Sequence, residues 1–90
     1  MKEEFEAYLV SKGYSVETPA GKPSTVHDYC GRIERICKDR NITWDKLAEN
    51  IVSIAAEYDV GGVKQDVGAQ SHNAVRSALL QFKEFVESIS

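Results

Sequence analysis

The sequence predicts a small all-α protein that forms one domain over residues 1–90, a bundle of four helices. Four segments carry apolar residues at the i, i+3, i+4, i+7 spacing of one helix face. No segment reads as a strand with a neighbouring strand to pair with. The composition, 42% apolar and 28% charged, is that of a globular chain, and its length allows a single modest core.

The first predicted helix covers residues 2–12. Gly13 stands where a left-handed glycine commonly ends a helix. The next segment, residues 14–23, is predicted as a loop because two prolines and a glycine interrupt regular structure. The apolar face of the first helix consists of Phe5, Tyr8 and Leu9.

The second predicted helix begins at Ser24 or Thr25 and ends near Arg40. Either hydroxyl can accept hydrogen bonds from the backbone N–H groups of the first turn. Asn41 tolerates the left-handed conformation that follows many helices. The buried stripe of this helix is expected to contain Val26, Tyr29, Cys30, Ile33, Ile36 and Cys37.

The third predicted helix runs from its N-cap, Thr43, to about Tyr58, and Trp44 at its entry is expected to cover one end of the core. Residues 59–70 contain three glycines. We expect a flexible loop there, with a short hairpin as the alternative, because an isolated hairpin has no sheet to join. The apolar face of the third helix consists of Leu47, Ile51, Ile54 and Ala55.

The fourth predicted helix covers residues 71–87, and Ser71 is a candidate N-cap. One side of it is polar, with Leu80 among the polar residues. Its buried stripe is expected to contain Val75, Ala78, Leu79, Phe82, Phe85 and Val86, with Ile89 as a continuation.

The two cysteines indicate a reducing environment. Cys30 and Cys37 are seven residues apart on one predicted helix, about 10.5 Å along its axis. A disulfide needs Cα atoms within about 7 Å, so the two cannot pair across an intact helix. The chain also lacks a run of 18 apolar residues and the basic start of a signal peptide. We therefore expect reduced core thiols and a cytoplasmic location.

The net charge of −3 argues against a strong nucleic-acid binder, because such domains are usually basic. The charge is uneven, however. Residues 1–10 carry one lysine against three glutamates, a balance of −2, whereas residues 22–46 carry six cations against four anions, a balance of +2. A basic face is therefore compatible with the negative total.

A set of residues in chain order matches three short motifs: "F..YL...G.S", "T...Y...I" and, with one exception, "S..T....L..FK.F". Ala74 stands where the last motif has Thr. With these motifs the chain resembles the N-terminal core-binding domain of tyrosine recombinases, the SAM-like domain of phage integrases. The matching residues are Phe5, Tyr8, Leu9, Gly13, Ser15, Thr25, Tyr29, Ile33, Ser71, Leu79, Phe82, Lys83 and Phe85.

The resemblance implies an orthogonal SAM-like bundle whose second and fourth helices face duplex DNA. It also implies a C-terminal catalytic domain as partner, which carries the arginines, the histidine and the nucleophilic tyrosine. That domain is not in this chain, so we expect a DNA-binding domain that is not an enzyme and uses no cofactor. Two origins stay open: a fragment of a full recombinase, or a stand-alone relative that lost catalysis.

The predicted DNA contacts lie on the polar sides of the second and fourth helices. Arginine and lysine neutralise phosphates, and hydroxyls and helix N-terminal N–H groups add hydrogen bonds. Asn73 or Arg76 could reach a base edge. The alternative is that these residues are only the solvated sides of amphipathic helices. The predicted contacts are Thr25, His27, Arg32, Arg35, His72, Asn73, Arg76 and Lys83.

Two other kinds of site find little support in the sequence. His27, Cys30 and Cys37, even with His72 added, lack the paired C-x₂-C spacing of a structural zinc site, so no metal is predicted. No nucleophile elbow or phosphate-binding glycine loop occurs either.

The second function class is a protein-interaction module. Leu80, next to Arg76 on the outer side of the fourth helix, could pack against a catalytic domain or a neighbouring protomer. A DNA-binding protein should present a positive stripe shared by the second and fourth helices. An interaction module should present a contiguous apolar patch there instead.

Overall fold

The computed structural model describes residues 1–14 and 25–89, apart from the side chains of residues 70–72. These residues form helices and no strand, so the all-α prediction is confirmed. The number of helices predicted was too low. The third predicted helix is divided into two, and the loop predicted for residues 59–70 contains a short helix. The helices are α1 (Lys2–Ser11), α2 (Thr25–Arg40), α3 (Trp44–Glu49), α4 (Ile51–Tyr58), α5 (Gln65–Gly68) and α6 (Gln70–Ser88).

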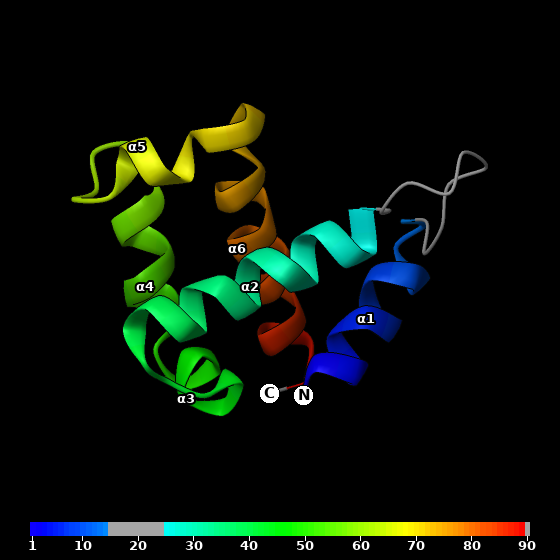
Figure 1. Cartoon of the computed structure of the whole chain (residues 1–90). Helices are drawn as coiled ribbons and strands as arrows, with labels where there is room; N and C mark the ends of the chain where they lie inside the picture. The colour runs from blue at the N-terminus through cyan, green and yellow to red at the C-terminus, as the bar shows by residue number, and fades with distance from the viewer. Residues whose placement is uncertain (15–24, 90) are drawn as a thin grey trace.

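The helix α6 is the centre of the arrangement, because every other helix packs against it. In Figure 1, α2 crosses in front of α6, α4 and α5 lie to one side, and α1 lies to the other. The helices α1 and α2 also contact each other. The Cα radius of gyration is 12.6 Å, close to the value of about 13 Å expected for a compact chain of about this length.

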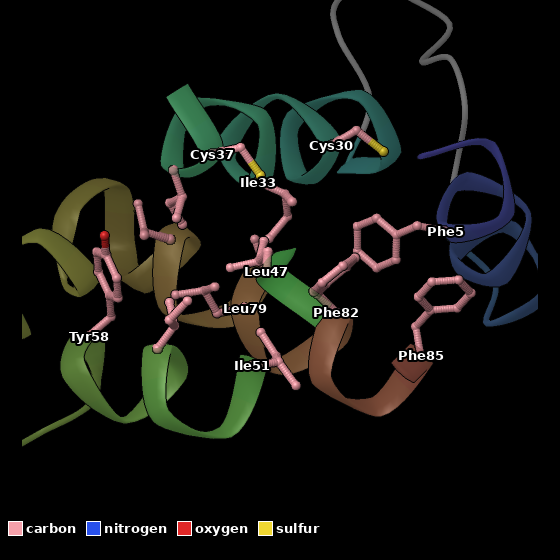
Figure 2. Packing of buried hydrophobic residues seen from close by; sticks show 14 of the residues in the cluster. Phe5, Cys30, Ile33, Cys37, Leu47, Ile51, Tyr58, Leu79, Phe82 and Phe85 are labelled. Atoms are coloured by element: carbon pink, nitrogen blue, oxygen red, sulfur yellow. The ribbon is translucent and has the colours of Figure 1, made fainter. Parts of the chain in front are cut away.

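The predicted apolar stripes form the core. Phe5 and Leu9 of α1 are completely buried, and the α2 and α6 stripes are buried or half-buried. An aromatic cluster joins the two ends of the chain: the ring of Phe5 lies 5.2 Å from that of Phe82, edge to face, and 5.6 Å from that of Phe85. Figure 2 shows these three rings together. The ring of Trp44 lies 5.6 Å from that of Phe82, so Trp44 covers the core as predicted.

Gly13, Asn41 and Thr43 end or cap helices as predicted, whereas the prediction that Ser71 is an N-cap is wrong, because Ser71 lies within α6, whose N-cap is Ala69. Gly13, after α1, has a φ of +96°, and Asn41, after α2, has a φ of +54°. The hydroxyl of Thr43 accepts a hydrogen bond from the backbone N–H of Lys46 at 3.1 Å, which is the N-cap of α3. The proposed cap Ser24 and the loop 15–23 lie outside the described residues. Ile89, expected to extend the α6 stripe, is exposed instead.

The third predicted helix is wrong as a single element, because it breaks at Asn50 into α3 and α4. The side-chain amide of Asn50 donates to the carbonyl of Lys46 at 3.0 Å. In a continuous helix, the backbone N–H of Asn50 would bond to that carbonyl. This N–H bonds to the carbonyl of Leu47 instead, at 3.2 Å, and the chain turns before α4.

The loop predicted for residues 59–70 omits a short helix, α5, which packs against α4 and α6. Gly61 has a φ of +86°. Gly62 and Gly68 pack directly on carbonyl groups of α4: a Cβ at Gly68 would overlap the carbonyl oxygen of Tyr58, and one at Gly62 that of Ala56. Glycine therefore lets α5 approach the end of α4 closely.

Both cysteines are buried and form no disulfide with each other, as their places in the α2 stripe and their spacing predict. Figure 2 shows both side chains on the core side of α2. Burial raises the pKa of the Cys30 thiol to about 11 and also raises that of Cys37. Both groups are therefore un-ionised at neutral pH and act as small apolar residues.

Replacing Gly68 with alanine should destabilise the protein. The added methyl group would overlap the Tyr58 carbonyl oxygen, so α5 must move away from α4. We expect the free energy of unfolding in urea to fall by about 1–3 kcal/mol.

Gly31→Ala is the matched control, because a Cβ at this position in α2 meets nothing within 4 Å. We expect it to raise the free energy of unfolding by about 0.5–1 kcal/mol. Equal effects of the two substitutions would contradict the close contact between α5 and α4.

Candidate nucleic-acid interface

The outer side of α2 contains a shallow hollow with a volume of about 420 Å³. Its floor is at Gly31, which is exposed and has no side chain to fill the space. The polar residues around it come from the adjacent turns of the same helix. The residues that line the hollow are His27, Asp28, Gly31, Arg32 and Arg35.

Two arginines at the hollow are held by aspartates of their own helix. The Nε of Arg32 donates to Asp28 at 3.0 Å, and the Nε of Arg35 donates to Asp39 at 3.2 Å. Both bonds join residues four apart, the spacing at which helix side chains meet. Each guanidinium is thus oriented through Nε, which leaves its terminal nitrogens to face a ligand. This edge matches the two oxygens of a phosphate or carboxylate.

Arg32 and Arg35 also line a second hollow of about 250 Å³ between α2 and the α5–α6 side of the molecule. Apolar residues of three helices form much of its wall, among them Tyr58, Val67 and Val75. The side chain of Arg35 is 77% exposed and that of Arg32 is 25% exposed. The two arginines therefore lie between the two hollows and line both of them.

Other residues of α2 extend this polar side. Thr25 and His27 are exposed in its first turn. Lys38, one turn beyond Arg35, is exposed and forms no ion pair within the part of the chain that the structure describes. Lys38 is not among the contacts predicted from the sequence, although its spacing of seven from Gly31 places it on the same side of the helix.

Arg40, the last residue of α2, is committed to a contact within the fold. Its Nη1 and Nη2 donate to the two carboxylate oxygens of Glu57, both at 3.1 Å. The hydrogen bonds that Arg40 donates to Glu57 raise the pKa of this guanidinium further above its ordinary value. The pair joins the end of α2 to α4, so Arg40 stabilises the fold and is not part of the polar hollow.

Arg76, one of the predicted DNA contacts on α6, is also bound within the protein. Its Nε donates to the carbonyl of Tyr58 at 3.2 Å, and its Nη2 to the carbonyl of Gln65 at 3.3 Å. The carboxylate of Asp59 lies 3.5 Å from its Nε. Its side chain is only 24% exposed. Arg76 therefore joins α6 to the end of α4 and to α5. Its positive charge is also favourable at the C-terminal, carbonyl end of α4.

Asn73 has a structural role at the same corner. It has a φ of +67°, a conformation that asparagine tolerates better than most residues. Its side-chain oxygen accepts a hydrogen bond from Nη1 of Arg76 at 2.7 Å. Figure 1 shows the first turn of α6 lying in line with α5 before the rest of the helix turns away. The side chain of His72, another predicted contact, lies outside the described residues.

Lys83 faces a different hollow from the α2 arginines. It lines a groove of about 270 Å³ between α4 and α6, together with Arg76 and Asp59. Two exposed apolar residues stand at this groove, Leu80 and Val52, with exposed fractions of 52% and 63%. The groove shares no lining residue with either hollow at α2. The structure therefore does not bring the predicted α2 and α6 cations together in one groove.

Within the part of the chain that the structure describes, no three His, Cys, Asp or Glu residues lie close enough together to hold a metal ion. None of its helices is both long enough and apolar enough to cross a membrane.

Compared with protein-family models, curated proteins and solved structures, the chain shows no significant match to any of them. The integrase-type resemblance therefore stays a prediction based on motifs and helix order. The fold and the site together define a coarser class: an all-helical protein with a hollow on α2, lined by two ion-paired arginines, and a separate apolar groove between α4 and α6.

Replacing Arg76 with alanine should reduce stability. The substitution removes hydrogen bonds to two backbone carbonyls at a half-buried position. We expect the free energy of unfolding to fall by about 1–3 kcal/mol, measured by urea denaturation followed by circular dichroism.

Lys83→Ala, on the same helix, is the control and should change the free energy of unfolding by no more than about 0.5 kcal/mol. An Arg76→Ala protein as stable as the original would contradict the structural role of Arg76.

Proposed function

We propose that this protein is a DNA-binding domain of the integrase core-binding, SAM-like type, and that it contacts the backbone of duplex DNA through α2. One observation carries the proposal: Arg32 and Arg35 lie at the rim of an open hollow on α2, each oriented through Nε by an aspartate of the same helix. Oriented guanidinium groups are the typical protein ligands of phosphate oxygens.

The proposal differs in two respects from the contact set expected from the sequence. Arg76 and Asn73 are engaged with each other and with backbone carbonyls, so we assign them to the fold. Lys38 joins Arg32 and Arg35 as a third cation on the exposed side of α2. The Nε atoms of Arg32 and Arg35 are already bonded to Asp28 and Asp39, so only the terminal nitrogens are open to a ligand. We therefore expect the contacts to be mainly with phosphates.

Binding by such a face should be weak and sensitive to salt. The whole chain has a net charge of −3, so only the local charge of α2 favours DNA. With three cations near phosphates, the slope of log affinity against log salt concentration is expected to be about −2.7.

Charge reversal at the hollow should abolish DNA binding. We expect Arg32→Glu and Arg35→Glu each to remove measurable binding of a labelled duplex, because each replaces a phosphate ligand with a repelling carboxylate. Fluorescence anisotropy at two salt concentrations measures both the affinity and its salt dependence.

Lys46→Glu is the control, because Lys46 is an exposed cation on α3, outside the hollow. It should change the affinity much less than the α2 substitutions do. A folded original protein that binds no duplex at low salt would reject the proposal. An equal loss of affinity in all three variants would show only a response to total charge.

A second candidate function is that of a protein-interaction module, favoured by the groove between α4 and α6. Val52 and Leu80 are exposed there beside the small residues Ala55 and Ala56. The α6 wall of the groove carries Arg76 and Lys83, whereas the α4 wall ends in Asp59. A second copy of this chain, docked by the same groove, would bury the exposed side chains of Val52 and Leu80 of both copies.

Leu80→Glu tests this second candidate, because it places a charge at the centre of the apolar contact. We expect sedimentation equilibrium to show association of the original protein at high concentration and a monomer for the variant. A monomeric original protein at every concentration would exclude self-association through the groove, and Leu80→Glu should leave DNA binding unchanged.

A further inference from the structure

Gly31 occupies a position where glycine is unfavourable. It lies in the middle of α2, which runs from Thr25 to Arg40, and it is exposed. Glycine in a helix interior is less stable than alanine, because it has more conformational freedom to lose on folding. A glycine at such a position usually has a packing or functional reason.

The fold gives no structural reason for a glycine at position 31. The other glycines that the structure describes each have such a reason: Gly13 and Gly61 have positive φ values, and Gly62 and Gly68 lie against backbone carbonyls of α4. Gly31 has no positive φ, and a Cβ built on it meets nothing within 4 Å. The chain itself therefore leaves room for a side chain at this position.

The effect of the glycine is on the surface. His27 and Arg35 lie one turn before and one turn after Gly31, so the bare backbone between them forms the floor of the hollow. Arg32, with its guanidinium held by Asp28, stands beside this floor. A group that rests on Gly31 can thus come close to the helix while it faces the terminal nitrogens of both arginines.

We propose that Gly31 is the point of closest approach between α2 and a DNA strand, where a phosphate of the duplex backbone rests on the bare helix surface between Arg32 and Arg35. This inference rests on the proposed DNA-binding function and adds the position of the strand. A side chain at residue 31 would hold the strand away from the helix and lengthen its bonds to both guanidinium groups. Because a phosphate is present at every nucleotide, recognition at this hollow is independent of base sequence.

The test is a graded series, Gly31→Ala and Gly31→Leu, in the full chain. Thermal unfolding should show that neither variant is less stable than the original, because both side chains fit the open space and favour helix. Fluorescence anisotropy with a labelled duplex should show weaker binding in the same order. We expect about a tenfold loss of affinity for alanine, the equivalent of about 1.4 kcal/mol, and a larger loss for leucine.

Ala7→Leu is the matched control, because it enlarges a side chain at an exposed helical position of α1, away from the hollow. It should leave the affinity unchanged. Two duplexes of unrelated sequence should give the same order of affinities across the series.

The possible outcomes separate this inference from the function on which it rests. If the original protein binds no duplex, the proposed function fails and this inference fails with it. If the original protein binds and both Gly31 variants bind equally well, only the close approach at Gly31 is overturned. Loss of stability in Gly31→Ala would also overturn it, because the fold would then require the glycine.

Discussion

The packing of all other helices on α6 is the constraint on which this structure depends. A short chain has only one modest core, and here α6 supplies its shared surface, with Ala78, Leu79 and Phe82 almost completely buried. Phe5 reaches this surface from the first helix, and its ring contacts those of Phe82 and Phe85. The aromatic cluster thus joins the N-terminal helix to the last helix (Figure 2).

The corner between α4 and α6 is held by contacts that use backbone groups. Gly68 lets α5 lie against the carbonyl of Tyr58, and Arg76 donates a hydrogen bond to the same carbonyl from α6. Asn73 holds the side chain of Arg76 and takes the left-handed conformation where α6 changes direction. The polar residues on this side of α6 therefore stabilise the corner, and a polar residue on a helix is not by itself a sign of a ligand.

The exposed side of α2 differs from that corner in what its polar groups contact. The ion pairs of Arg32 and Arg35 are made within the helix through Nε, so they orient the side chains without joining two parts of the fold. Pairs of this kind contribute little to stability. The bare surface at Gly31 has no packing role either. We assign binding to this side because the guanidinium groups of Arg32 and Arg35 are held in place next to an open hollow but do not join parts of the fold.

The sequence by itself determined the helical class, the buried stripes of Phe5, Ile33 and Phe82, and the ends of helices at Gly13 and Asn41, because these follow from local periodicity and backbone preference. The candidate site was predictable only as a set of polar residues on two helices. Tertiary structure alone decided which of them are committed to the fold, because that depends on which carbonyls and carboxylates the folded chain brings near each side chain. The break at Asn50 and the ordered corner at Gly68 were likewise decided by hydrogen bonds and close contacts that exist only in the folded chain.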